Sequence, residues 1–346
     1  MLSQFLCKAS TITSNSLICA SRTLQLTIPK NDRFSREYLR SRLNKLKLDQ
    51  KPVHIKEVEC SHKDVIPIRP ISHLKTVVAF AGAVTVGSFT LAAIIKYERE
   101  KEQIKTIIQN INGYFGQTHN DAARPNSAID WNRLTLPQKV AAGIIMTNAV
   151  VTVLWKVPRL VPFMTTYFTN SFAQKKLCLP MLTSVFSHAS FIHFGLNMYV
   201  LSTFAPVAMH KFAGVEYFCA LYASAGVVSS MTSLIHKAII RAPSRALGAS
   251  GAILGILTYT CMKMPEARLH IIFIPGLEFS AENAVIGILI MDIIGLVGPW
   301  KMFDHAAHLG GALFGITYAL WGEQFIRHYF ENQVMTVYEK IKNKFR

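Results

Sequence analysis

Residues 248–255 read Gly-Ala-Ser-Gly-Ala-Ile-Leu-Gly and open a run without charged side chains, Leu247 to Met262. This run is apolar enough to form a helix inside a membrane. Polar groups at membrane depth are costly and usually mark functional sites, so the serine calls for a functional explanation. The stretch therefore predicts a membrane fold and supplies a first candidate site residue, Ser250.

Six further apolar runs predict helices on either side of this one. They are Thr76 to Ile95, Val140 to Trp155, Leu177 to Met209, Tyr217 to Ile235, Ala284 to Trp300 and Phe303 to Trp321. Leu177 to Met209 is too long for one straight span. Pro180 and the hydroxyl-rich stretch Thr183 to Ser190 predict a partly embedded loop, followed by a helix from about Phe191. We expect an all-α polytopic membrane protein with one leading span and six more closely spaced ones.

Composition supports a membrane protein. Of the 346 residues, 51% are hydrophobic and 16% are charged, whereas soluble domains have about 25% charged residues. These values exclude a disordered chain, a collagen and a coiled coil, and they make an ordinary cytosolic enzyme a poor explanation. The six cysteines form no CxxC pair, so the sequence predicts neither a disulfide framework nor a zinc site.

The basic N-terminus accounts for part of the formal charge of +17. Residues 1–30 contain Lys8, Arg22 and Lys30, no acidic residue and many hydroxyls, which is typical of an organelle transit peptide. A disordered basic arm is the alternative. Residues 31–75 stay basic but lack the regular interleaving of aromatic and basic residues that a single-strand groove needs, so nucleic-acid binding is not favoured.

Loop charge predicts the orientation of the spans. The segment before Thr76 has a large excess of Lys and Arg, whereas the loop after the first span is nearly balanced by its acids, Glu98, Glu100, Glu102, Asp121 and Asp130. The positive-inside rule then places the N-terminus in a matrix-like compartment, and seven crossings place the C-terminus on the opposite side.

Polar residues recur near the starts of the third, fifth and seventh predicted helices. His193 and Asn197 lie in HFGLN, Ser250 in GASG and His308 in DHAAH, while Asp292 is alone within the sixth helix. Helices two crossings apart enter the membrane from the same side. We therefore expect the first four side chains to share one depth, and they are the residue types that acyl transfer needs.

Two glycine pairs predict close contact between the fifth and seventh helices. Gly311 and Gly315 follow His308 on one helix face, and Gly251 and Gly255 follow the serine. Small residues four apart let helix backbones approach closely, and a Ser–His pair needs a separation of roughly 2.6–3.2 Å. Ordinary glycine-mediated packing is the alternative.

Three motifs together resemble a known family. GASGAILG, AHLGGALFG and HASFIHFGLNMY are similar to the motif helices of the rhomboid intramembrane serine proteases, in the same order. The resemblance covers roughly Pro137 to Gly322 and implies a rhomboid six-helix core. The extra leading helix and the transit-like N-terminus resemble mitochondrial members of the family. The implied organisation is a transit-like segment 1–30, a basic matrix-facing region 31–75, an extra transmembrane helix 76–95, a linker loop 96–136, a catalytic core 137–322 and a charged tail 323–346.

The resemblance also implies roles for individual residues. Ser250 corresponds to the nucleophile and His308 to the general base. Asn197 and His193 correspond to residues that stabilise the oxyanion, with Gly248 supporting them beside the backbone N–H of the serine. No cofactor or metal is implied.

Four other positions leave alternatives open. His188 is a candidate supporting residue, and Asp304 either completes a triad with His308 or satisfies a loop or helix N-terminus. Leu254 replaces a tyrosine that stacks on the histidine in some relatives. Asp292 is interpreted as a polar packing contact or part of the loop toward His308. Without a second matching Asp or an HExxH motif, an aspartyl protease or metalloprotease is not favoured.

The implied function is a multi-pass serine endopeptidase of the mitochondrial inner membrane. Its substrates would be imported proteins with single membrane anchors, which links it to protein processing, mitophagy, apoptosis and membrane dynamics. The N-terminus would lie in the matrix and the C-terminus in the intermembrane space. A non-catalytic rhomboid-like protein that binds transmembrane helices is the alternative; a transporter would require internal repeats that are not evident.

Overall fold

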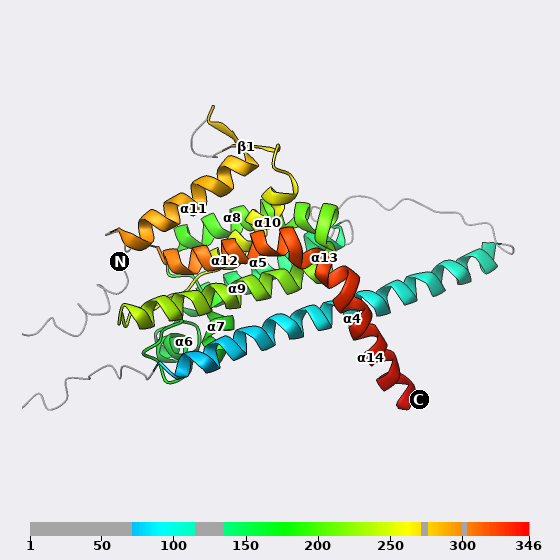
Figure 1. Ribbon diagram of the computed structural model, residues 1–346, viewed down its shortest axis with the longest axis horizontal. Coiled ribbons are helices and arrows are strands. Elements are labelled where there is room, and N and C mark those ends of the chain that lie inside the picture. The colour runs from blue at the N-terminus through cyan, green and yellow to red at the C-terminus, as the bar shows by residue number, and fades with distance from the viewer. Residues whose placement is uncertain (1–70, 115–133, 271–275, 299–302, 346) are drawn as a thin grey trace, which may run out of the picture. The chain divides into compact units, whose positions relative to one another are not determined.

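The structure is a computed structural model that describes residues 71–114, 134–270, 276–298 and 303–345 (Figure 1). All of them belong to one compact unit, Ile68–Arg346. The transit-like segment 1–30 and almost all of the basic region 31–75 lie outside the described residues, so the expectations for them stay predictions.

The leading helix, α4, spans His73–Tyr114 and is much longer than the predicted membrane crossing. Val77 near its start packs with Leu234 near the end of α9 (Gly214–Ile239), whereas Arg99, further along α4, forms an ion pair of 2.8 Å with Glu216 near the start of α9. The two helices therefore run antiparallel. The first part of the predicted linker loop 96–136, up to Tyr114, is therefore helical. Ion pairs of Lys96 and Arg99 with other helices hold the beginning of this part in place.

The remaining predicted spans are also helices. They are α5 (Leu136–Leu154), α8 (Phe191–Ala208), α9, α10 (Ser250–Lys263), α11 (Ala281–Val297) and α12 (His305–Thr317). Three helical segments of the described chain are long and apolar enough by themselves to cross a membrane: His73–Asn110, Leu136–Leu154 and Phe191–Ile239, which joins α8 to α9. The expected all-α membrane fold, with one helix ahead of six, is confirmed.

Short elements connect these helices. The 3₁₀ turn η2 (Pro158–Leu160) and the helix α6 (Val161–Tyr167) follow α5, and the predicted embedded loop before α8 contains the helix α7 (Cys178–Thr183) and the 3₁₀ turn η3 (Ser184–Phe186). The π-helical turn η4 (Met209–Ala213) joins α8 to α9, and a hairpin of β1 (Arg268–His270) and β2 (Glu278–Ser280) joins α10 to α11.

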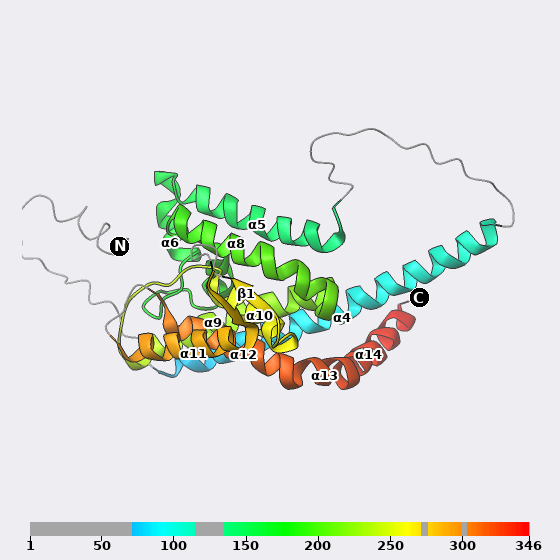
Figure 2. The ribbon, with the colours of Figure 1, turned by 90° about the horizontal axis from the view of Figure 1, so that it is seen from above.

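The chain beyond α12 stays helical rather than forming an extended tail. It passes through η5 (Tyr318–Gly322), α13 (Glu323–Phe325), η6 (Ile326–Phe330) and α14 (Glu331–Lys344). Figure 2 shows α14 beside the later part of α4. Lys96 pairs with Glu331 at 2.9 Å and Lys342 pairs with Glu98. The C-terminal helix is thereby attached to the leading helix by charged side chains.

Helix starts follow local capping signals. Thr135 and Gln138 form a capping box at α5, and the Ser190 hydroxyl accepts the N–H of His193 at α8. The fifth helix begins at Ser250, three residues later than the apolar run, because Gly248 has a φ of +134° and donates its N–H to the Ser184 carbonyl. The nucleophile candidate thus stands at a helix N-terminus.

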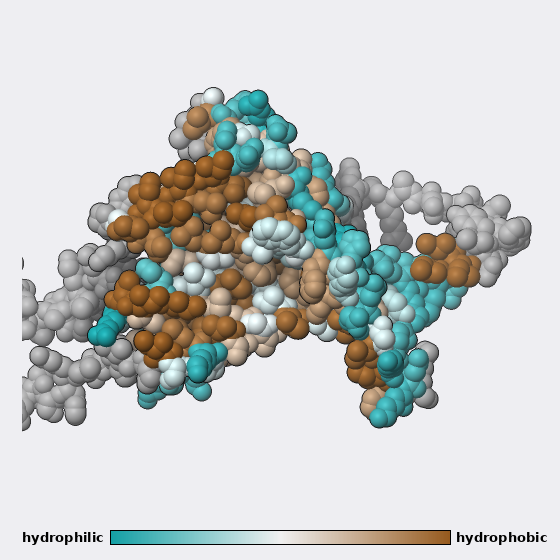
Figure 3. All heavy atoms as spheres, viewed as in Figure 1, coloured by the Kyte–Doolittle hydropathy of each residue, from teal (hydrophilic) through white to brown (hydrophobic). Residues whose placement is uncertain are grey.

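Helices α9, α10 and α12 pack at the centre, and glycines set the distance between the last two. A Cβ on Gly311 would overlap the Gly251 carbonyl oxygen, and one on Gly315 would overlap the Gly255 carbonyl oxygen. The structure therefore brings the two glycine pairs into direct backbone contact. Apolar side chains cover the outer surface of α11 (Figure 3), as expected for a helix that faces lipid.

Candidate active site

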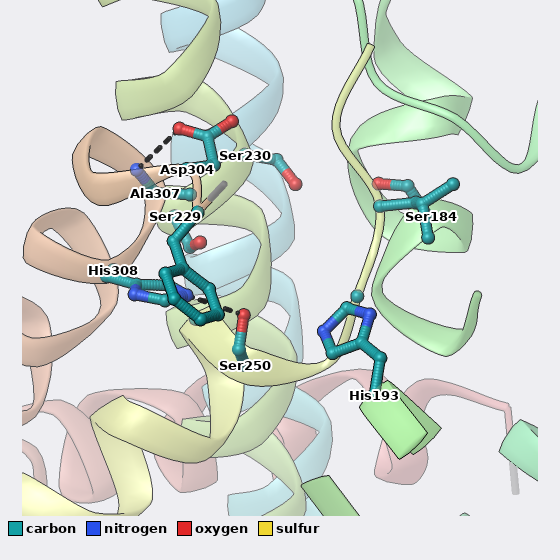
Figure 4. Close-up of a pocket in the computed structure, with 12 residues that line it drawn as sticks. Ser184, His193, Ser229, Ser230, Ser250, Asp304, Ala307 and His308 are labelled. Atoms are coloured by element: carbon teal, nitrogen blue, oxygen red, sulfur yellow. Dashed lines mark hydrogen bonds between the residues drawn. The ribbon is translucent and has the colours of Figure 1, made fainter. Parts of the chain in front are cut away.

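The candidate site is a small pocket where the first turns of α8, α10 and α12 meet α9 (Figure 4). Ser250 is the first residue of α10, and His308 lies in the first turn of α12. The parity of the crossings predicted that these helix starts share one side of the membrane. The described structure brings them to one pocket.

Ser250 and His308 form a direct hydrogen bond. The His308 Nε2 lies 2.9 Å from the Ser250 Oγ, which is the dashed contact in Figure 4. This distance is within the range for a nucleophile and its base. The glycine contacts between α10 and α12 make the approach possible, because Gly311 lies three residues after His308 and faces the backbone of α10.

Asp292 of α11 supplies the partner for the other nitrogen of the same ring. Its side chain is fully buried, and its Oδ1 lies 3.2 Å from the His308 Nδ1. When Nδ1 carries the proton and donates it to this carboxylate, Nε2 is left free to accept the serine proton. The sequence alone suggests only a packing contact or loop residue at Asp292, so its contact with the histidine was missed.

Asp304 lies elsewhere in the pocket wall. Its Oδ1 accepts the N–H of Ala307 at 3.1 Å and caps α12, and its Oδ2 accepts from Ser233 and from Lys237, both at 2.6 Å. Of the two alternatives, the structure shows the helix N-terminus, and the hydrogen-bond partners of the Asp304 carboxylate in the described part of the chain do not include the His308 ring. Asp304 and Lys237 instead attach the start of α12 to α9.

His193 faces the serine from the side opposite His308 (Figure 4). Its ring lies over Gly248, where an added Cβ would be only 2.8 Å from the His193 Cε1. His188 packs behind it, with ring centroids 5.0 Å apart, and is fully buried without a hydrogen-bond partner among the described residues. Gly248 therefore leaves room for the imidazole beside Ser250.

Asn197 is not placed against the pocket. Its amide donates to the His193 carbonyl at 2.8 Å, one turn back in its own helix, and the residue is absent from the pocket wall as far as the chain is described. Ser250 and Gly251 at the start of α10 do line the pocket, and the first backbone N–H groups of a helix have no partner within the helix. Of the residues expected at the oxyanion, the structure brings His193 and Gly248 beside the serine.

Sequence reasoning also missed three residues that line the pocket. Ser229 and Ser230 of α9 carry no motif that singles them out, and Phe303 precedes α12. The Phe303 ring centroid lies 6.1 Å from that of His308. Leu254 offers no aromatic ring to the histidine, and the structure places the rings of Phe303 and, at 6.2 Å between centroids, His305 beside it.

The cluster of Asp292, His305 and His308 has ligand atoms that all lie within 4.8 Å of one another. Such a set has the chemistry of a metal site. Each Nδ1 is already hydrogen-bonded to the Asp292 carboxylate, at 2.7 Å for His305 and 3.2 Å for His308. Hydrogen bonding within the cluster is enough to explain its geometry.

Comparison with known proteins places this geometry in a family. Residues 176–324 match the Rhomboid domain. Over 269 residues the chain is 42% identical to presenilin-associated rhomboid-like protein, mitochondrial, of Homo sapiens, covering 75% of this chain and 69% of that protein. The chain belongs to the rhomboid family. The resemblance drawn from three sequence motifs is thus confirmed.

Other relatives are mitochondrial as well. Presenilin-associated rhomboid-like protein A of Danio rerio is 39% identical over 282 residues, 75% of this chain and 73% of that protein. Rhomboid protein 1 of Saccharomyces cerevisiae is 28% identical over 186 residues, 53% of each chain. Together with the apolar helices, these matches identify a mitochondrial rhomboid-type membrane protein.

Proposed function

We propose that this rhomboid-family protein is a serine endopeptidase that cleaves transmembrane anchors within the mitochondrial inner membrane. The 2.9 Å contact between Ser250 and His308 is the observation that carries the proposal. Asp292 supports it, because its buried carboxylate fixes the histidine tautomer in which Nε2 accepts a proton. Ser250 and His308 line the pocket, and Asp292 contacts the histidine from α11.

The mechanism follows from this arrangement. His308 Nε2 takes the proton of the Ser250 hydroxyl as Oγ attacks the scissile carbonyl carbon. The collapse of the tetrahedral intermediate breaks the C–N bond, and the histidine gives the proton to the leaving amine. Water, deprotonated by the same histidine, then hydrolyses the acyl-enzyme and restores the serine.

The negative charge of the tetrahedral intermediate needs donors beside Ser250. We assign this role to the backbone N–H groups at the start of α10 and to the His193 ring, which lies over Gly248. A helix N-terminus also favours negative charge. Removal of one such donor typically costs about 10²–10³ in kcat. Asn197 joins them only if its amide leaves the His193 carbonyl when substrate binds.

The substrates we propose are imported proteins with a single membrane anchor, whose helix unwinds locally to present a peptide bond. Such substrates connect the enzyme to mitochondrial protein processing, mitophagy, apoptosis and membrane dynamics. Loop charge supports an N-terminus in the matrix and a C-terminus in the intermembrane space, so the pocket opens toward the matrix. Protection of a C-terminal tag from added protease in mitoplasts would contradict that orientation.

The test is cleavage of a reporter transmembrane helix by the purified protein in liposomes. Wild type should cleave it, and Ser250→Ala and His308→Ala should not, with all three proteins equally folded. Unchanged cleavage by the variants would exclude these residues as the catalytic pair. Tight binding of the helix without cleavage by the wild type would favour a non-catalytic rhomboid-like protein.

A further inference from the structure

His305 contacts the same carboxylate as the proposed general base. Its Nδ1 lies 2.7 Å from the Asp292 Oδ1, whereas the His308 Nδ1 lies 3.2 Å from that same oxygen. His305 is 4% exposed and Asp292 is fully buried. The shorter hydrogen bond of the carboxylate is therefore made with a histidine that does not contact the serine.

The His305 ring also rests directly on α11. Gly295 lies three residues after Asp292, and a Cβ on it would overlap three atoms of the His305 ring, including Nε2. The absence of a side chain at Gly295 thus leaves the space that the imidazole occupies. A hydrogen bond to Asp292 and close packing on Gly295 both hold the His305 side chain of α12 against α11.

These contacts matter because α11 has few others near the site. Among residues 289–297 of α11, the two that are buried are Asp292 and Gly295, and both contact His305. Their neighbours Ile290, Ile293 and Ile294 are each about half exposed on the lipid-facing surface. His305 therefore contacts both of the buried residues in this part of α11.

We infer that His305 is a positioning residue that holds α11 against α12 and keeps Asp292 at the Nδ1 of His308. The inference rests on the proposed function, since it assigns a supporting role in that reaction. Loss of the His305 N–H leaves the buried carboxylate with only its longer hydrogen bond, to the His308 Nδ1, and removes the contact that holds this part of α11 against α12. Asp292 then moves away from His308, and the general base loses its orientation.

Two substitutions separate the hydrogen bond from the volume of the ring. His305→Leu removes the donor, whereas His305→Asn keeps an N–H close to the position of Nδ1. In the reporter assay we expect His305→Leu to lower kcat by about 100-fold with little change in KM, since small misplacements of catalytic groups cost this much. His305→Asn should stay within about tenfold of wild type. Equal losses in the two variants would overturn the inference.

The role of the space at Gly295 can be tested with a matched control on the same helix. Gly295→Ala displaces the His305 ring and should lower kcat, whereas Gly287→Ala adds a methyl group where nothing lies within 4 Å and should leave kcat unchanged. Similar kcat values for both variants would contradict the claim that the space at Gly295 positions the His305 ring.

A double-mutant cycle distinguishes positioning from general stability. In an Asp292→Asn background, His305→Leu should reduce kcat by less than about twofold further, because the carboxylate through which it acts is gone. Full additivity would show that His305 acts independently of Asp292 and would overturn the inference.

A final readout needs no activity. Hydrogen exchange of α11 backbone amides is measured in Ser250→Ala protein with and without His305→Leu. We expect faster exchange in residues 289–297 with leucine and not with asparagine at position 305. Unchanged exchange would refute the docking of α11 by His305, whereas a failed reporter assay with altered exchange would refute the proposed function alone.

Discussion

Gly311→Ala is a stringent test of the contact between α10 and α12, which carry the proposed catalytic pair. The added Cβ would overlap the carbonyl oxygen of Gly251, a backbone atom that cannot move by changing a rotamer. The added Cβ would lie 2.0 Å from that oxygen, so restoring a normal contact of about 3.5 Å requires α12 and α10 to separate by about 1.5 Å. Overpacking of this kind costs about 1–3 kcal/mol of folding free energy.

The same separation disrupts the Ser–His contact. His308 lies one turn before Gly311, and its Nε2 is 2.9 Å from the serine Oγ. A shift of about 1.5 Å takes the pair beyond hydrogen-bond distance and lowers kcat by at least about 100-fold, which equals about 2.7 kcal/mol in activation free energy.

The assay measures kcat in liposomes and the thermal midpoint in detergent. Gly143→Ala on α5 is the matched control, because its methyl group meets open space, and it should leave both values at or slightly above wild type. Wild-type cleavage by a folded Gly311→Ala protein would refute the idea that glycine contact sets the Ser–His distance.

Three further predictions concern the surroundings of the site. Lys237→Met leaves the Asp304 carboxylate without its cation and should lower the free energy of unfolding by about 3 kcal/mol; denaturation in detergent measures this, and an unchanged midpoint contradicts it. Gly248→Ala places a methyl group at a φ of +134° and against the His193 ring, so kcat/KM for the reporter helix should fall. An unchanged kcat/KM in the folded variant would contradict this. The hydrogen bond from Tyr97 lowers the pKa of Glu339 below its usual 4.5, so its contribution to docking α14 is present at neutral pH and is lost as the pH falls through that lowered pKa. Limited proteolysis of the C-terminal helix should therefore speed up once the pH falls below that lowered pKa, and equal rates at pH 7 and about pH 3 would contradict this.

The membrane helices could be predicted from the sequence because the signal is local. Apolar runs marked the seven spans, and the late start of α8 followed from Pro180 and the hydroxyls before Phe191. The common side of Ser250 and His308 followed from counting crossings. The glycine spacing indicated which two helices approach closely, and the structure places those glycines on facing carbonyl groups.

The rest depends on how helices rotate and extend, which no local pattern records. Asp292 is sixteen positions from His308, on a helix whose rotation about its axis is set by packing against α12. No sequence pattern favours it over Asp304, which is closer in the chain. The continuation of α4 to Tyr114 was missed because its polar sequence suits a loop equally well until Glu216 and Glu331 pair with it.

The central claim is that Ser250 is a nucleophile activated by His308. A fluorophosphonate probe, followed by intact-mass and peptide analysis of the purified protein in liposomes, tests it most directly. We expect a single adduct on Ser250, no adduct in Ser250→Ala and much slower labelling in His308→Ala. Labelling of another residue, or of Ser250 at the wild-type rate in His308→Ala, would contradict the claim.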